Sequence, residues 1–155
     1  MKKFTFGELK IMVNKINIGI VGYGNLGRAV EKALMNSEDL KLEAIFTRRN
    51  VKNIISDSKL LHISEIKNYI GIIDVMILCG GSATDLPQQS AEIAKYFNVI
   101  DSFDTHAKIE EHFIGVDKVS KENEKIALLS VGWDPGLFSL NRLLGKAIIP
   151  NSTEY

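Results

Sequence analysis

The sequence has a single cysteine and only three histidines among its 155 residues. A lone cysteine, Cys79, excludes an internal disulfide and fits a reducing compartment such as the cytoplasm. We interpret it as a small buried residue rather than a nucleophile, because no histidine stands near it in a recognisable pattern. His62, His106 and His112 do not have the spacing of metal ligands, so the sequence indicates no metal site.

The chain also lacks an excess of charge of either sign and any long apolar run. Lys and Arg together number 19, as do Asp and Glu, so neither nucleic acid nor a membrane surface is an expected partner. No apolar run approaches the roughly 18 residues that span a bilayer. Hydrophobic residues nevertheless make up 45% of the sequence, enough for the core of one compact domain.

The first fifteen residues give no clear structural signal. They are basic and carry scattered apolar residues, without the uninterrupted apolar segment of a signal peptide. We expect residues 1–15, which precede the domain, to be a leader or a mis-called start, with Met12 as the true start. A short amphipathic helix on the surface is the alternative.

The rest of the sequence alternates short apolar runs with amphipathic stretches. The predicted strands cover residues 16–21, 41–47, 60–63, 74–79, 98–101 and 126–130. The predicted helices cover residues 25–35, 87–97, parts of 108–124, and 137–149. The run at 74–79 is almost continuously apolar, as a central parallel strand requires. This alternation predicts an α/β fold with a doubly wound parallel sheet.

A glycine-rich turn follows the first predicted strand and opens the first helix. Residues 22–27 match G-x-G-x-x-G in the strand-to-helix context of a Rossmann-like dinucleotide-binding domain. Gly22 would permit the tight turn, Gly24 would leave room for a pyrophosphate, and Gly27 would let the helix pack on the strand. The alternative is a turn without a ligand. The expected cofactor-binding residues here are Gly22, Tyr23, Gly24, Asn25, Leu26 and Gly27.

The end of the second predicted strand indicates which dinucleotide binds. NAD-binding domains usually place a carboxylate there, but this chain has Thr47, Arg48 and Arg49. A hydroxyl and two guanidiniums suit the 2′-phosphate of NADP, which arginine binds through charge-assisted hydrogen bonds. A solvated basic strand end without a ligand is the alternative.

The segment 79–85 (CGGSATD) follows another predicted strand, at the edge where open α/β sheets place their ligands. Its small residues would let a nicotinamide or its ribose approach the backbone. A plain loop with a helix cap is the alternative.

Two carboxylates follow the next two strands. Asp104 lies in the segment 101–106 (DSFDTH), where a helix N-cap for the residues from Ala107 onward is the alternative. Asp134 lies in the segment 132–136 (GWDPG), which a simple β-turn would also explain. Taken together, the two carboxylates and the neighbouring indole predict a site for a cationic amine. No G-x-S-x-G pattern of a serine hydrolase is present.

Five segments together resemble the meso-diaminopimelate dehydrogenase family. They are INIGIVGYGNLGRAVEKAL, TRR, CGGSATD, DSFDTH and SVGWDPGLFSLNR, and the similarity extends from Ile16 to Arg142. The resemblance implies NADP-dependent oxidative deamination at the D-centre of meso-2,6-diaminopimelate. The product, L-2-amino-6-oxopimelate, cyclises to tetrahydrodipicolinate, and the reverse reaction is a branch of lysine biosynthesis. The resemblance also implies a cytoplasmic homodimer for the full-length enzyme.

The resemblance assigns roles to individual residues. The Thr-Arg-Arg segment matches a Ser-Arg-Arg of the family that holds the 2′-phosphate. Asp104 and Asp134 match two carboxylates of the family that bind the D-centre amine, and Trp133 matches the family's neighbouring tryptophan. We expect the two aspartates to be the catalytic groups, and which of them takes a proton stays open. The further expected cofactor-binding residues are Cys79, Gly80, Gly81, Ser82, Ser102, Phe103, Val131, Gly132, Trp133 and Pro135.

The chain departs from this family in length, since family members are roughly twice as long. We expect residues 16–136 to form the NADP-binding domain. We expect residues 137–155 to begin the connection to a missing substrate and dimerisation domain, so that the chain binds NADP without turnover. Two alternatives are a non-catalytic NADP-binding module and another NADP oxidoreductase of the same architecture, such as a homoserine-type enzyme. The GWDPG turn argues against the latter.

Overall fold

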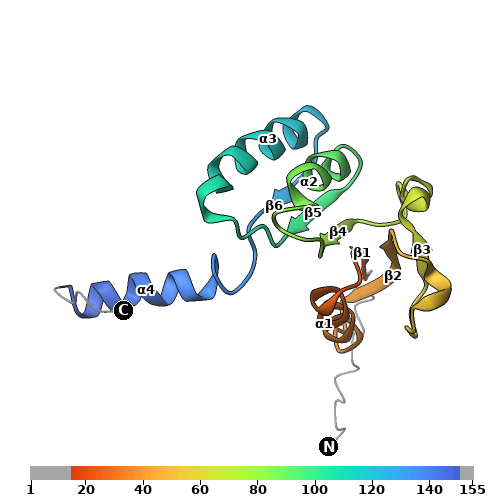
Figure 1. Cartoon of the computed structure of the whole chain (residues 1–155), viewed down its shortest axis with the longest axis horizontal. Helices are drawn as coiled ribbons and strands as arrows, with labels where there is room; N and C mark the ends of the chain where they lie inside the picture. Colours follow the sequence, from red (N-terminus) through yellow and green to blue (C-terminus); the bar gives the residue numbers. More distant parts are fainter. Residues whose placement is uncertain (1–14, 151–155) are drawn as a thin grey trace, which may run out of the picture.

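The computed structural model describes residues 15–150 and contains a six-stranded parallel sheet (Figure 1). The order across the sheet is β3-β2-β1-β4-β5-β6. The strands are β1 (Ile16–Val21), β2 (Leu40–Thr47), β3 (Leu60–His62), β4 (Val75–Leu78), β5 (Asn98–Asp101) and β6 (Ala127–Leu128). The helices are α1 (Asn25–Met35), α2 (Leu86–Ala94), α3 (Ile109–Glu122) and α4 (Leu137–Ile148).

This topology confirms the predicted fold class. β1 is parallel to both of its neighbours, β2 and β4. The chain therefore adds strands first on one side of β1 and then, from β4 on, on its other side, as in doubly wound dinucleotide-binding domains. β4 lies near the middle of the sheet, as its apolar sequence predicts. The expectation for the first fifteen residues lies outside the described residues, apart from Lys15.

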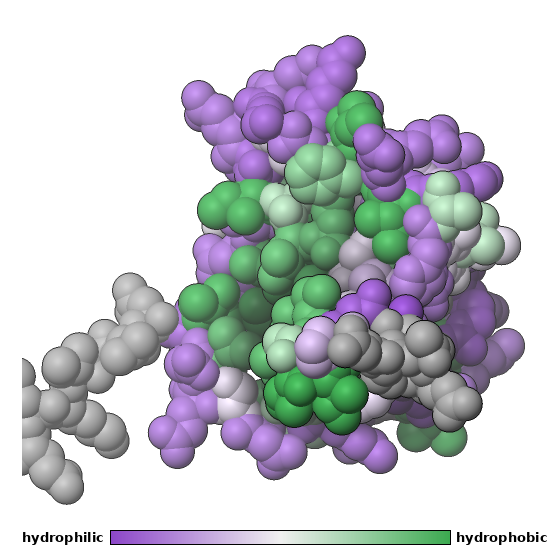
Figure 2. All heavy atoms as spheres, turned by 90° about the vertical axis from the view of Figure 1, so that its left-hand side faces the viewer, coloured by the Kyte–Doolittle hydropathy of each residue, from purple (hydrophilic) through white to green (hydrophobic). Residues whose placement is uncertain are grey.

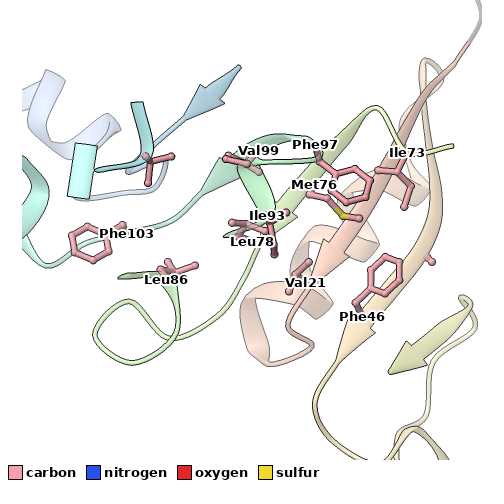
Figure 3. Packing of buried hydrophobic residues seen from close by; sticks show 13 residues of the cluster. Val21, Phe46, Ile73, Met76, Leu78, Leu86, Ile93, Phe97, Val99 and Phe103 are labelled. Atoms are coloured by element: carbon pink, nitrogen blue, oxygen red, sulfur yellow. The ribbon is translucent and has the colours of Figure 1, made fainter. Parts of the chain in front are cut away.

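Two layers of helix pack on opposite faces of the sheet. α1 packs on β1 and β2 and, with them, encloses a small core around Ile18, Ile20 and Leu34. On the other face α2 packs over β4 and β5, and α3 packs against α2 and β6, where Figure 3 shows the larger core cluster. In that cluster Leu86 and Phe103 are almost completely buried. The loops after β1, β4 and β5 therefore emerge from well-buried strands.

The α1 side of the sheet is unevenly covered. Ile45, Ile20, Ile77, Ile100 and Leu128 form one row across neighbouring strands. Ile45 and Ile20, beneath α1, are 0% exposed, whereas Leu128 at the β6 edge is 54% exposed. Figure 2 shows hydrophobic residues gathered at the surface on the side of the molecule that bears α4. The β6 end of the sheet is thus the less buried end.

α4 projects away from the sheet (Figure 1). None of its residues is buried, although its sequence is largely apolar. Among the helices of residues 15–150, neither α4 nor any other is long and apolar enough to cross a membrane.

The structure differs from the predicted boundaries in several places. The strand predicted over 126–130 shortens to β6 because Ser130 takes a left-handed backbone conformation (φ 58°) and leaves the ladder. The helix predicted to reach Phe97 ends at Ala94. A 3-10 segment at Ile63–Tyr69, which the sequence reasoning missed, begins with a capping box between His62 and Glu65.

Candidate cofactor and amine sites

The three glycines of the turn after β1 have three different environments. Gly22 has φ +92°, and a Cβ there would lie 2.9 Å from the carbonyl oxygen of Cys79. A Cβ on Gly27 would collide with the carbonyl oxygen of Gly22, so this glycine is what lets α1 lie against β1. A Cβ on Gly24 would meet nothing within 4 Å. The open space at Gly24 is therefore available to a ligand.

These environments predict that Gly24→Ala and Gly27→Ala act on different properties. Gly24→Ala fits the backbone φ of −89° and should leave the melting temperature unchanged. It should weaken the expected binding of NADP about tenfold or more, because the new methyl group would occupy the space expected for the pyrophosphate. Gly27→Ala should destabilise the fold by about 1–3 kcal/mol through overpacking. Thermal unfolding and NADP titration of both variants test this, and a lower melting temperature for Gly24→Ala would contradict it.

The amino terminus of α1 faces a cleft of about 280 Å³ between the ends of β1, β2 and β4. Gly24 is its N-cap, with no side-chain cap and no acidic residue in the first turn. The helix end therefore presents backbone amides and a positive dipole to the cleft, which suits a phosphate. The expected cofactor residues that line this cleft are Gly22, Tyr23, Gly24, Thr47, Arg48, Arg49, Cys79, Gly80 and Gly81.

The side chain of Tyr23 points away from the ligand space. It is buried, and its hydroxyl donates a hydrogen bond to the carboxylate of Glu31. Burial, followed by the bond to Glu31, raises the pKa of Tyr23. Ser56 donates a second hydrogen bond to Glu31, at 2.8 Å. Only the backbone of Tyr23 is thus available to a cofactor.

Both arginines of the Thr-Arg-Arg segment lie at the cleft and are partly engaged. Arg48 Nη2 lies 2.7 Å from Asp85 Oδ1 and its side chain remains 66% exposed. Arg49 donates to the carbonyl oxygen of Tyr23, and its backbone N–H donates to the Thr47 hydroxyl at 3.2 Å. A guanidinium has five N–H donors, so each retains donors for a phosphate.

Asp85 is a residue of the cleft to which the sequence reasoning gave no role. Besides Arg48, it accepts the Gly81 N–H at Oδ2, 3.0 Å away. Gln89, one helical turn further along, also lines the cleft. The sequence did contain a signal for this role. Asp85 stands four residues after Gly81, a spacing at which its carboxylate can accept the Gly81 N–H within the same loop.

Cys79 lies at the base of the same cleft, and burial raises the pKa of its thiol to about 12. This agrees with the interpretation of a buried residue rather than a nucleophile. We expect iodoacetamide at pH 8 to alkylate Cys79 at least about a hundredfold more slowly in the folded chain than in urea, because the thiolate is the reactive form. Equal rates in both states would contradict this.

The raised pKa of Cys79 also fixes the sign of its contribution to stability. A thiol whose pKa is higher in the folded state favours folding fully below its ordinary value of 9.0. That contribution is lost as the pH rises toward about 12. The free energy of unfolding should therefore fall less between pH 9 and pH 12 in Cys79→Ala than in the wild-type chain, as measured by urea unfolding.

The two loops that carry the candidate carboxylates lie side by side after β5 and β6. The Val131 N–H donates to the carbonyl oxygen of Asp101 at 2.9 Å, which joins the loops directly after the strands. Asp134 Oδ1 accepts from the Ser139 hydroxyl at 3.0 Å, and its Oδ2 lies 3.8 Å from His106 Nε2. His106, two residues after Asp104, is thus a member of this site that the sequence reasoning left without a role.

The alternative reading of Asp104 as a helix cap is wrong. The helical segments after it are capped by Thr105 and Lys108, neither through its side chain. Asp104 is exposed, and its backbone N–H donates to the Ser82 hydroxyl at 2.9 Å. Ser82 in turn bonds the Thr105 hydroxyl at 3.1 Å, so the loop after β4 supports the loop after β5. The Asp104 carboxylate remains accessible to a ligand.

Other predicted residues take up different positions. Trp133 is 62% exposed and stacks on Phe138, with ring centroids 5.9 Å apart. Phe103 is buried and stacks on His112, so its side chain does not reach the cofactor cleft. Ser102 donates a long hydrogen bond of 3.5 Å to the carbonyl of Leu78. The remaining expected cofactor residues lie outside the lining of that cleft: Asn25, Leu26, Gly27, Ser82, Val131, Gly132 and Pro135.

No family model matches the chain, but comparisons with known proteins found strong similarities in sequence and in fold. The meso-diaminopimelate D-dehydrogenase of Ureibacillus thermosphaericus is 55% identical over 145 residues, which are 92% of this chain and 44% of that protein. A multiply substituted meso-diaminopimelate dehydrogenase of Clostridium tetani E88, solved with DAP, is 58% identical with a TM-score of 0.79 over 86% of this chain and 42% of that one. An engineered D-amino acid dehydrogenase bound to NADP+ is 36% identical with a TM-score of 0.81, over 87% and 42%. The chain spans less than half the length of the curated relatives that it matches.

Proposed function

We propose that this chain, which is homologous to the amino-terminal part of the meso-diaminopimelate dehydrogenases, binds NADP and contributes half of an active site for oxidative deamination. The substrate would be meso-2,6-diaminopimelate, oxidised at its D-centre. The observation that carries the proposal is the juxtaposition of two features. A basic dinucleotide cleft lies at the ends of β1 and β2, and two carboxylate loops lie at the ends of β5 and β6 on the same edge of the sheet.

In this proposal the cofactor is held mainly by the backbone. The α1 amides and Gly24 receive the pyrophosphate, and Arg48 and Arg49 receive the 2′-phosphate through donors not already engaged. Gly80 and Gly81 line the same cleft and would lie beside the nicotinamide ribose, with the side chains of Asp85 and Gln89 packed against Gly80. When bound, NADP supplies the acceptor for the hydride that leaves the D-centre carbon.

The two carboxylates would bind and orient the D-centre ammonium. Asp104 and Asp134 place negative charge where the amine sits, and this charge also stabilises the iminium that develops as the carbon–hydrogen bond breaks. The amine must lose a proton for the imine to form, and a carboxylate within reach can accept it. His106 beside Asp134 offers a second group that can receive this proton. Water then adds to the iminium carbon, and ammonia leaves.

Two measurements test the proposal. The chain itself is titrated with NADP and with NAD, and we expect tighter binding of NADP. For turnover, residues 15–150 are joined to the part of the Ureibacillus thermosphaericus enzyme that follows its matched segment, and this hybrid enzyme is assayed with meso-diaminopimelate and NADP. We expect the hybrid enzyme to be active and the chain alone to be inactive. A hybrid that folds and binds NADP but does not deaminate would favour a non-catalytic nucleotide-binding module.

A further inference from the structure

A buried carboxylate, Asp101, lies directly beneath both candidate amine-binding loops. It is the last residue of β5 and is 1% exposed. Its Oδ1 accepts the backbone N–H groups of Phe103 at 3.2 Å and of Ser130 at 2.9 Å. Phe103 precedes Asp104, and Ser130 stands four residues before Asp134. One oxygen atom therefore binds both loops.

The second oxygen atom of Asp101 is fixed to the helical layer. Oδ2 accepts hydrogen bonds of 2.7 Å from the Ser90 hydroxyl on α2 and from His112 Nε2 on α3. A carboxylate only accepts, so Nε2 of His112 carries the proton. Both partners are themselves buried. The orientation of the carboxylate is thus set by two helices that belong to the rigid part of the domain.

The backbone around Ser130 indicates that the contact to Asp101 is needed to hold the loop. Ser130 has φ 58°, a conformation that costs a non-glycine residue free energy unless surrounding contacts maintain it. Those contacts are its own N–H on Asp101 Oδ1 and the Val131 N–H on the carbonyl oxygen of Asp101. At this point the chain turns from β6 toward the loop of Asp134.

We propose that Asp101 is a positioning residue, which sets the relative placement of Asp104 and Asp134 by binding both loops through one oxygen atom. This inference rests on the proposed function, since it concerns the geometry of the same amine site. Asp101 itself is buried and touches no ligand. It acts through the loops, and its loss should misplace two carboxylates at once. A displacement of 1 Å in such groups can cost about a hundredfold in rate.

The kinetic test compares three variants of the hybrid enzyme. Asp101→Ala should lower kcat/KM for meso-diaminopimelate about 10- to 100-fold while the KM for NADP changes less than about threefold. Asp101→Asn should restore much of the activity, because its amide oxygen can still accept from both loops. Its amino group would donate to the Ser90 hydroxyl, and to His112 Nε2 once the ring proton moves to Nδ1. Val116→Ala, in the adjacent α3 core, serves as a control for lost stability. It should lower the melting temperature without changing either KM.

The loop contacts are tested without substrate in the 155-residue chain. Amide exchange at Phe103 and Ser130 should quicken about tenfold or more in Asp101→Ala and stay near the wild-type rate in Asp101→Asn. Should Asp101→Ala not fold, the wild-type chain still gives an answer by NMR. Scalar couplings across the hydrogen bonds should join both amide nitrogens to the Asp101 carboxyl carbon, and their absence in a folded chain would overturn the proposal.

The outcomes separate this inference from the proposed function. An unsubstituted hybrid that binds NADP but does not deaminate would reject the proposed function, while the exchange and coupling measurements would still report on the loops. An active hybrid in which Asp101→Ala behaves like Val116→Ala would reject Asp101 as a positioning residue and leave the function standing.

Discussion

Asp134→Asn in the hybrid enzyme should lower kcat/KM for meso-diaminopimelate by about a hundredfold or more while NADP binding survives. The substitution keeps the shape of the side chain and its bond to Ser139, but removes the charge that attracts the ammonium and stabilises the iminium. Losing one electrostatic or general-base group typically has this effect. Asp104→Asn should behave similarly. The double variant should lose less than the product of the two effects, because both carboxylates serve one ammonium.

The matched control for these variants is Asp117→Asn on α3. Asp117 pairs with Lys121 on the surface of the helix, so this substitution makes the same chemical change away from the site. Its steady-state constants should equal those of the unsubstituted hybrid enzyme. If Asp104→Asn and Asp134→Asn were both as active as this control, neither residue would bind the amine, and Asp134 would be only a turn residue.

Replacing Arg48 and Arg49 by alanine should weaken NADP binding by about 2–4 kcal/mol, or about 30- to 700-fold. The estimate takes charge-assisted hydrogen bonds at roughly 1.5–3 kcal/mol each and discounts them because Arg48 is largely exposed. NAD affinity should hardly change, since NAD lacks the 2′-phosphate. Isothermal titration of the chain with both dinucleotides measures the difference.

Lys118→Ala with Lys121→Ala is the control for this double variant. Both lysines lie on α3, so their replacement removes the same charge from the chain without touching the cleft. NADP affinity should fall much less than in the arginine variant. Equal losses for NADP and NAD in the arginine variant would mean that the arginines support the fold, through the bond of Arg49 to Tyr23 and the pair of Arg48 with Asp85, instead of recognising the 2′-phosphate.

The sequence predicted the strands and the glycine turn well because both depend on local patterns. β1 and α1 match their predicted bounds, since a β-branched run ending in glycine and an amphipathic stripe are both short-range signals. The left-handed Ser130, which shortens β6, was not predicted because its cause is a hydrogen bond to Asp101, 29 residues earlier. A pattern read along the chain contains no such contact.

The same limit applies to the site. The residue types and strand-end positions of Asp104 and Asp134 were readable from the sequence. Their long-range partners were not, because Ser82 reaches Asp104 from the loop after β4 and His106 reaches Asp134 from the loop after β5. Tyr23 illustrates the converse. Its place inside the glycine motif predicts a cofactor contact, but its ring bonds to Glu31 and leaves only backbone at the surface.

The uneven covering of the sheet gives the domain a gradient of local stability. Strands beneath α1 should exchange their amide protons only through global unfolding, whereas β6, with Leu128 half in solvent, should open by itself at much lower free energy. The dinucleotide cleft lies at the end of the sheet where amide exchange should be slow, and the carboxylate loops lie at the end where it should be fast. NADP should therefore meet a site that is already formed, while the amine site gains its final order only when something packs against the β6 edge.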